Sequence, residues 1–254
     1  GGAKRWVLLG TDYVYPRTTT KILNYFLKSK GVAKKDIMET YTPFGHSDYQ
    51  TIVADIKKFA AGKPTAVVST INGDSNVPFY KELGNQGLKA EDIPVVAFSV
   101  GEEELRGIDT KPLVGHLAAW NYFMSVKTPE NKAFIKKWNA YVKKNKLPGG
   151  SKRVTNDPME ATYIGIKMWA QAVEQAGTTN IDAVRQAIGG QTVQSPSGFE
   201  ITMDAKNHHL HKPVVIGEIQ EDGQFEVVWK TDGPIRAQAW SPFIPESSKK
   251  VADW

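Results

Sequence analysis

Two tyrosines stand directly after the first apolar run of the chain. Residues 6–9 fit a buried strand that ends at Gly10 and Thr11, and Tyr13 and Tyr15 follow in a loop. In an open parallel sheet, ligands bind at the carboxyl ends of the strands. A phenol ring offers a flat wall and a hydroxyl that can donate or accept a hydrogen bond. No strong nucleophile stands beside the tyrosines, which favours non-covalent binding of a small polar ligand over catalysis.

Further polar residues follow two later predicted strands, at 64–71 and 94–99. A carboxylate there can accept two N–H groups of an amide-like ligand, but an Asn-Gly-Asp segment is also ordinary turn chemistry. Glutamates after a strand also begin helices. Aromatic residues near position 120, where the pattern changes, either line the site or stiffen the connection. The candidate ligand-binding residues are Tyr13, Tyr15, Asn72, Asp74, Ser75, Ser99, Glu102, Trp120 and Tyr122.

Several kinds of chemistry are disfavoured by the residues present. The chain has no cysteine, which excludes disulfides, thiolate metal sites and cysteine nucleophiles. It has no G-x-S-x-G elbow, and His46 and His116 are isolated. His209 and His211 can share one face of an extended segment, but two ligands are too few for a closed zinc site. No G-x-G-x-x-G follows the first strand. We therefore expect no catalytic residue, no metal and no cofactor.

The charge pattern argues against a nucleic-acid partner. The formal net charge is +5, and it comes from lysine pairs spread along the chain. No arginine-rich stripe with interleaved aromatic residues marks a nucleic-acid surface. No apolar run approaches the ~20 residues that a membrane helix needs. Because Gly1 to Lys4 lead straight into a strand without a signal peptide, we expect a chain that is either cytoplasmic or already processed.

Strands and helices alternate through the first half of the chain. Strands are predicted at 6–9, 36–42, 64–71, 94–99 and 113–118, with helices near 17–30 and 76–84 between them. A further helix is predicted after a capping box of Ser47 and Gln50, with apolar residues from Ile52 to Phe59 on one side. Short connections of this kind predict a doubly wound parallel sheet and an α/β fold.

The second half of the chain follows a different pattern. Helices are predicted from Thr128, from Asp157 and over 181–188, and Asp222-Gly223 predicts a hairpin between 214–220 and 224–230. Residues 128–190 have no predicted strand, and their amphipathic helices need another surface on which to pack.

Six segments resemble the type I periplasmic solute-binding proteins. The similarity is greatest to the binding proteins of urea ABC transporters, which are related to short-chain amide-binding regulators. The resemblance implies a two-lobed protein that binds urea or a short amide without altering it and delivers it to ABC permease subunits. The matching segments are GTDYVYPRTT (10–19), STINGDSNVPFYKELGNQG (69–87), FSVGEEELRG (98–107), GHLAAWNYFMSVKTPENKAFIKKW (115–138), NDPMEATYIGIKMWAQAV (156–173) and SPSGFEITMDAKNHHLHKPVVIGEI (195–219).

The resemblance also implies a domain assignment. Residues 1–119 and 212–254 would form the second, Rossmann-like lobe. Residues 120–211 would form a crossing segment and the helical remainder of a first lobe whose N-terminal part is missing. The missing lobe or another copy of the chain would then cover the exposed helices, and this chain alone would bind ligand weakly or not at all. A periplasmic or extracellular membrane-associated location is implied. The alternatives are a cytoplasmic amide-sensing regulator of the same fold and a branched-chain amino-acid binding protein.

Overall fold

The computed structural model describes residues 2–250. The described part of the chain divides into two compact units. The first comprises the residues up to Trp120 together with Ile216–Val228 and Pro242–Pro245. The second comprises Asn121–Val215, Trp229–Ser241 and the described residues from Glu246 onward. No helix among residues 2–250 is long and apolar enough to cross a membrane.

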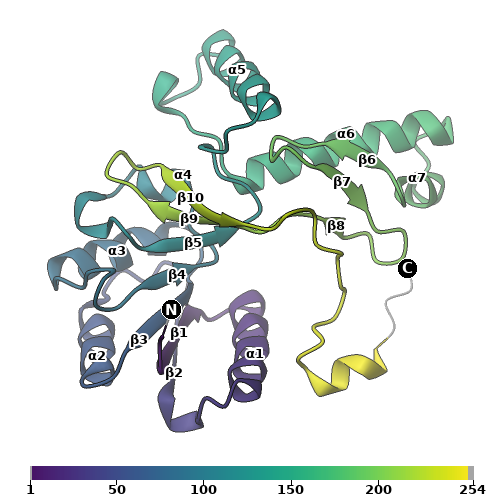
Figure 1. Ribbon diagram of the computed structural model, residues 1–254. Helices are drawn as coiled ribbons and strands as arrows, with labels where there is room; N and C mark the ends of the chain where they lie inside the picture. The colour runs from purple at the N-terminus through teal and green to yellow at the C-terminus, as the bar shows by residue number, and fades with distance from the viewer. Residues whose placement is uncertain (1, 251–254) are drawn as a thin grey trace. The chain divides into compact units, whose positions relative to one another are not determined.

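The first unit is built on a sheet that, within the described residues, has seven strands in the order β10-β9-β5-β4-β3-β1-β2. The run from β2 to β5 is parallel throughout. Figure 1 shows this sheet with its helices. The strands are β1 (Arg5–Thr11), β2 (Ile37–Thr42), β3 (Thr65–Thr70), β4 (Val95–Ala97), β5 (Leu117–Trp120), β9 (Val215–Ile219) and β10 (Phe225–Lys230).

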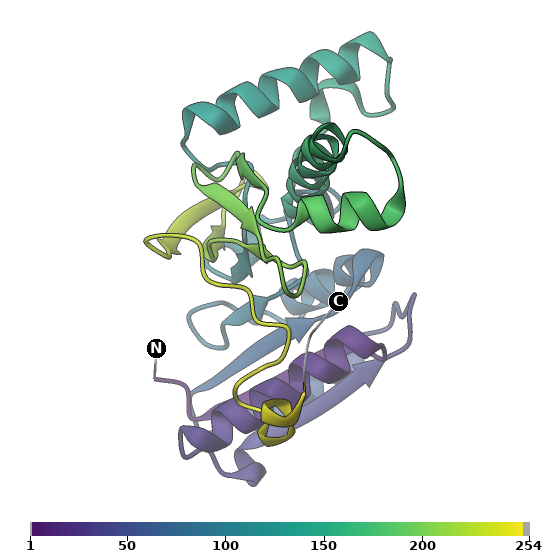
Figure 2. The same ribbon diagram turned by 90° about the vertical axis from the view of Figure 1, so that its right-hand side faces the viewer.

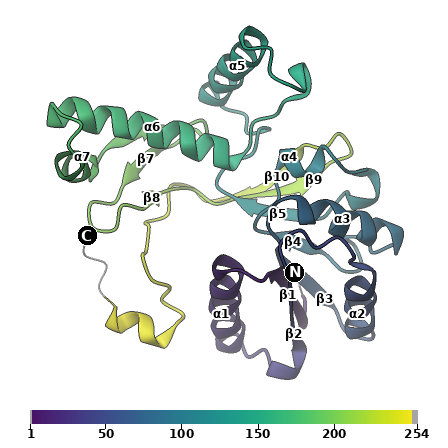
Figure 3. The ribbon, with the colours of Figure 1, turned by 180° about the vertical axis from the view of Figure 1, so that it is seen from behind.

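Helices cover both faces of this sheet, which confirms the predicted doubly wound α/β fold. Helix α1 lies on one side, and α2 and α3 lie on the other (Figures 1 and 3). All six residues of β3 are buried, as expected for a parallel strand covered on both faces. The helices are α1 (Val14–Ser29), α2 (Gln50–Ala60), α3 (Asn76–Asn85) and the short α4 (Glu102–Leu105), with 3₁₀ turns at Lys34–Asp36, Gly73–Ser75 and Lys111–Leu113.

The two faces of the sheet have different cores. Under α1, Leu27 packs with Leu8 of β1 and Val68 of β3. On the other face, the rings of Phe79 and Tyr80 are fully buried.

The second unit contains helices and a small sheet. Its helices are α5 (Pro129–Lys144), α6 (Asp157–Ala176) and α7 (Ile181–Ile188), with a 3₁₀ turn at Gly150–Lys152. Thr128 caps α5 by accepting a hydrogen bond from the backbone N–H of Asn131, at 3.0 Å. Asn156 caps α6 in the same way, at 3.2 Å from the nitrogen of Met159. The predicted starts of α5 and α6 are therefore confirmed.

The description of residues 120–211 as helical is corrected by the structure. Strands β6 (Thr192–Gln194), β7 (Glu200–Met203) and β8 (Leu210–His211) form an antiparallel sheet in the order β6-β7-β8. Ile164 and Met168 of α6 pack on Ile201 of this sheet, and Figure 2 shows α6 and α7 beside it. Strands of two to four residues are too short to give a period-two pattern in the sequence.

The segment 229–241 is also placed differently from the expectation that all of 212–254 returns to the Rossmann-like lobe. The backbone N–H of Thr231 donates to Val214 O at 3.0 Å, and that of Ile235 donates to Lys212 O at 2.8 Å. The N–H of Ala237 donates to Nδ1 of His211 at 2.7 Å. These bonds hold the segment within the second unit, and the chain ends its described part in a 3₁₀ helix, Pro245–Lys249.

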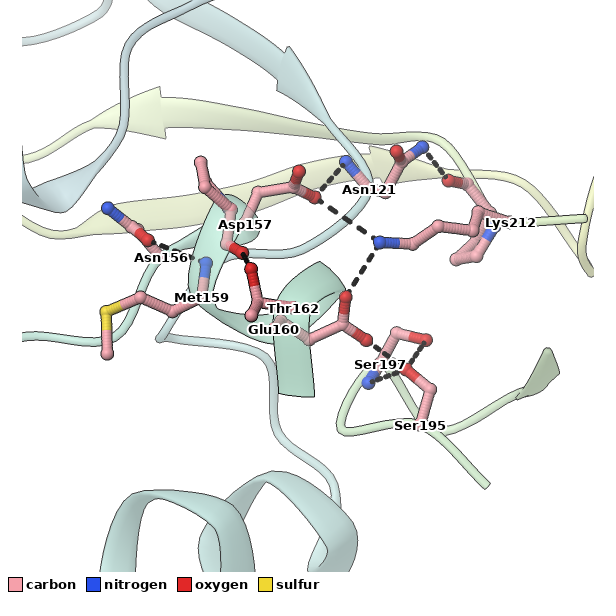
Figure 4. A network of polar contacts seen from close by, with 11 residues as sticks. Asn121, Asn156, Asp157, Met159, Glu160, Thr162, Ser195, Ser197 and Lys212 are labelled. Carbon is pink, nitrogen blue, oxygen red and sulfur yellow. Dashed lines mark hydrogen bonds and ion pairs between the residues drawn. The ribbon is translucent and has the colours of Figure 1, made fainter. Parts of the chain in front are cut away.

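A buried ionic network joins separate segments of the second unit (Figure 4). The ammonium of Lys212 lies 2.7 Å from Glu160 Oε2 and 3.8 Å from Asp157 Oδ1. Asp157 Oδ1 also accepts the backbone N–H of Asn121 at 3.0 Å. The other oxygen of Glu160 accepts the hydroxyl of Ser195. The first turn of α6 thereby holds the residues that follow β5, β6 and β8.

The carboxyl of Asp157 is unusual in this network. Burial raises its pKa to about 6, although the charge of Lys212 acts in the opposite direction. Glu160 is fully buried, so its charge depends on Lys212 and Ser195 in place of water.

The network predicts an asymmetric response to mutation. Replacing Lys212 with Met should lower the free energy of unfolding by about 3–5 kcal/mol, because Glu160 would stay buried without its cation. Adding Glu160→Gln should recover most of this loss. Denaturation by guanidinium chloride of the parent, the single variants and the double variant measures both effects. A Lys212→Met protein as stable as the parent would contradict the structural role of the network.

A buried histidine ties β4 to β5. His116 is fully buried, and its Nδ1 accepts the backbone N–H of Val95 at 3.0 Å. Its Nε2 lies 3.4 Å from Leu88 O, so the neutral ring with a proton on Nε2 satisfies both neighbours. Burial lowers the pKa of His116 from 6.5 to about 4.

His116 should make stability depend on pH in a defined direction. Between pH 6.5 and pH 4 the unfolded chain binds a proton that the folded chain does not, so the free energy of unfolding falls as pH decreases. We expect a loss of about 2 kcal/mol on going from pH 6.5 to about 5 that is absent in His116→Gln. Denaturation curves of both proteins across this range measure it. Equal pH slopes would contradict the depressed pKa.

Candidate functional site

The candidate site lies at the carboxyl edge of the sheet in the first unit. From β1 the chain proceeds to β2 on one side, whereas β3, the other neighbour of β1, is followed by β4 on the opposite side. The ends of β1 and β3 therefore form a topological switch point, where ligands bind in open α/β sheets. The backbone N–H of Asn72 donates to Thr11 Oγ1 at 2.9 Å and fixes the two loops to each other.

Glycine at position 10 is required by close packing at this edge. A Cβ atom there would overlap Thr70 Oγ1 and the ring of Pro16. The start of α1 therefore sits directly against the end of β1, and Tyr15 is carried close to the strand termini.

The structure brings Tyr15 and Ser99 together. The hydroxyl of Tyr15 donates to Phe98 O at 3.2 Å and accepts the hydroxyl proton of Ser99 at 3.1 Å. Burial raises the pKa of Tyr15, so the phenol stays protonated. Its oxygen retains a second lone pair, which can accept an N–H from a ligand.

The residues after β3 have different environments. Asp74 is exposed, whereas Ser75 is buried and hydrogen bonds to the hydroxyl of Tyr49. The side-chain nitrogen of Asn72 is buried and has no hydrogen-bond partner within the described chain. This segment therefore presents an exposed acceptor, Asp74, beside a donor, Asn72, whose hydrogen-bonding capacity is unused.

Asn76 also belongs to this edge, although no pattern in the sequence marks it as a site residue. Its side-chain nitrogen donates to Ile71 O at 2.9 Å, to Gly73 O at 3.1 Å and to Ser99 O at 3.2 Å. It thereby links the loops that follow β3 and β4. Its place among other turn-forming residues in NGDSN gave no separate signal.

Glu102 lies inside the fold. It is fully buried and begins α4. Glu104, two residues later, accepts the backbone N–H of Gly101 at 2.8 Å, and burial raises the pKa of Glu104. The expectation that acidic residues start a helix here is confirmed. Because the Glu102 side chain is inaccessible to solvent, the structure does not present it as a ligand contact.

The two aromatic candidates near the predicted crossing fall in different units. Trp120 ends β5 and is half-buried, and its indole N–H has no hydrogen-bond partner within residues 2–250. Tyr122 is fully buried in the second unit, where its hydroxyl donates to Asn131 Oδ1 at 2.7 Å and lies 2.8 Å from Thr155 Oγ1. The expectation that Tyr122 faces a ligand is therefore corrected: its ring and hydroxyl serve the interior.

Tyr13 and Tyr15 point in different directions, as their alternation in the sequence indicates. Tyr13 remains 48% exposed, and its ring contacts Phe44, from the loop after β2, at a centroid distance of 5.2 Å. Phe44 was not anticipated, because a lone aromatic residue in a Pro-Phe-Gly turn has no periodicity to mark it.

Two arginines near this edge are both paired with carboxylates, Arg17 in the first turn of α1 and Arg106 directly after α4. Arg17 lies 2.8 Å from Asp12, and Arg106 lies 2.7 Å from Glu103. Asp74 has no cationic partner among the described residues. The edge thus offers hydroxyl and carboxylate acceptors, and its guanidinium groups are already neutralised.

Solved structures with a similar fold are solute-binding proteins. An amino-acid ABC transporter substrate-binding protein of Pseudomonas fluorescens is 20% identical, with a TM-score of 0.74 over 90% of this chain and 59% of that chain. An ABC transporter solute-binding protein of Rhodopseudomonas palustris in complex with p-hydroxybenzoic acid is 22% identical, with a TM-score of 0.76 over 92% and 61%. A leucine-binding protein of Thermotoga maritima is 17% identical, with a TM-score of 0.70 over 90% and 60%. The chain therefore spans about three-fifths of the length of these structures.

The sequence itself matches one family over nearly its whole length. A protein named limonene hydroxylase, from Geobacillus stearothermophilus, is 35% identical over 129 residues, which are 51% of this chain and 22% of that protein. The periplasmic binding protein domain matches residues 1–246. With the doubly wound sheet and the structural likenesses above, this match shows that the chain belongs to the periplasmic binding protein family.

Proposed function

We propose that this chain is the ligand-binding part of an extracytoplasmic solute-binding protein that takes urea or a short-chain amide and delivers it unchanged to an ABC permease. The observation that carries the proposal is the group of acceptors at the switch point. The hydroxyl pair of Tyr15 and Ser99 lies at the same strand edge as the exposed carboxylate of Asp74. Urea and amides present several N–H donors, which these oxygens can accept, and a carbonyl, to which the side-chain amide of Asn72 can donate once a local rearrangement exposes its buried nitrogen.

The charge of the edge supports a neutral ligand over an acidic one. The ligands named for two of the structural relatives, p-hydroxybenzoic acid and leucine, both carry a carboxylate. At this edge Arg17 and Arg106 are already paired, and Asp74 would repel a second carboxylate. A polar group left unmatched on binding costs about 1–3 kcal/mol, which is sufficient for discrimination.

The same geometry supports binding without chemical change. The hydroxyl of Ser99 donates to a protonated phenol, which is not a base that could activate it. Ser75 is buried against Tyr49 and cannot reach a ligand without rearrangement. We propose no cofactor for this site.

A further part of the lobe that contains the second unit would complete the binding protein. Helix α6 buries Ile164 and Met168 against the small sheet but leaves Ile166 62% and Trp169 48% exposed on another face. The structural relatives are longer than this chain. We propose that a further sheet-bearing part of the same lobe covers the face of α6 that carries Ile166 and Trp169. We propose also that the two lobes of the protein close on the ligand by a hinge motion.

Ligand choice tests the proposal directly. NMR titration of the isotope-labelled chain should show dose-dependent shifts at residues 11–15, 72–76 and 98–99 with urea or acetamide, and none there with leucine or 4-hydroxybenzoate. This method detects millimolar binding, so weak affinity of the chain does not hide the effect. Larger shifts with leucine than with urea or acetamide would indicate an amino-acid binding protein and contradict the proposed ligand class. No response to any of the four would contradict the proposed site.

Replacing Tyr15 should weaken the binding of an amide ligand. Replacing Tyr15 with Ala removes both ring wall and hydroxyl and should weaken amide binding more than about tenfold, whereas Tyr15→Phe should lose about 1 kcal/mol from the missing hydrogen bonds. Titration with acetamide measures both. Tyr25, a half-buried tyrosine of α1, supplies the control variant Tyr25→Phe. Unchanged affinity of Tyr15→Ala would remove this residue from the site.

A further inference from the structure

Two exposed aromatic rings meet at the carboxyl edge of the sheet. Tyr13 is 48% exposed and Phe44 is 60% exposed. Their rings stand edge to face, with centroids 5.2 Å apart and planes at 66°. We call this pair the aromatic corner. Single exposed apolar residues need no explanation, but two large rings held together at the same sheet edge as the polar acceptors form a surface suited to a flat ligand.

The backbone under the aromatic corner is anchored beside the switch point. The N–H of Asp12 donates to Thr42 O at 2.7 Å, which extends the pairing of β1 with β2 into the loops. The hydroxyl of Tyr49 lies 3.3 Å from Thr42 Oγ1 and also bonds to Ser75, after β3. Because β1 lies between β2 and β3, the loop from Thr42 to Tyr49 spans the end of β1.

The residues next to the two rings are held as well. Arg17 pairs with Asp12, beside Tyr13, and its guanidinium lies 4.0 Å from the ring centroid of Tyr41, on β2. The rings of Tyr13 and Phe44 are therefore carried by ordered backbone while their own surfaces face solvent. A preorganised wall of this kind loses little conformational entropy when a ligand binds.

We propose that Phe44 is a further ligand-contacting and specificity-determining residue, and that the aromatic corner receives the flat face and N–H edge of a planar, uncharged amide. An aromatic face carries partial negative charge, so it attracts N–H groups and disfavours a carboxylate. The inference rests on the proposed function, because it names a second wall of the same site.

Phe243 provides a matched control within the same unit. It is 45% exposed, and its ring meets that of Phe26 edge to face, also at 5.2 Å, so it shares with Phe44 an exposed ring in an edge-to-face aromatic pair. Acetamide affinity is measured by NMR titration of the whole chain and of Phe44→Ala, Phe44→Leu, Phe243→Ala and Tyr15→Ala.

We expect Phe44→Ala to weaken acetamide binding about fivefold or more, and Phe44→Leu to weaken it as well, because leucine keeps apolar bulk without a π face. Phe243→Ala should bind within about twofold of the parent. Unchanged affinity of both Phe44 variants, with weakened binding by Tyr15→Ala, would overturn the role of Phe44 and leave the proposed function standing. Absence of acetamide binding by the parent chain would overturn both.

Discussion

The divergence of the connections that leave the parallel strands β1 and β3 is the constraint on which the candidate site depends. The connections that follow these adjacent strands diverge, and the Asn72 N–H to Thr11 Oγ1 hydrogen bond holds the two loops together where they part. Gly10 lets α1 begin against the strand ends, so Tyr15 reaches across to the loop after β4. Without this divergence the connection that follows one strand would cover the polar side chains at the end of the other. Ser75 and Glu102, at the same edge, are buried by neighbouring residues.

The second unit depends on a different kind of interaction. Its apolar core is small, and the largely buried side chain of Lys212 pairs with two carboxylates of the first turn of α6. Breaking such a pair is costly, whereas its net contribution relative to an apolar core is small. We infer that the network specifies how the segments after β5 and β8 lie on α6. Its members are distant in sequence, so it could not be foreseen from spacing.

The parts of the fold that could be predicted are those with a local signal. Apolar runs bounded by glycine gave the strands of the first unit, and Thr128-Pro129 gave the start of α5. The sheet β6-β7-β8 was missed because its strands are too short for a pattern. At the site, the predicted order of strands placed Tyr15, Asn72 and Ser99 at one edge of the sheet. It could not predict that Tyr122 is fully buried in the interior of the second unit. Asn76 and Phe44 act through neighbours supplied by other loops, which no local pattern contains.

A crystal structure of the chain grown with acetamide is the most direct test that the switch-point edge binds an uncharged amide without altering it. Intact acetamide is expected within hydrogen-bond distance of the Tyr15 and Ser99 hydroxyls, with Asp74 accepting its N–H groups. Acetamide bound elsewhere with this edge empty, or acetate and ammonia formed from it in the same solution, would contradict the account.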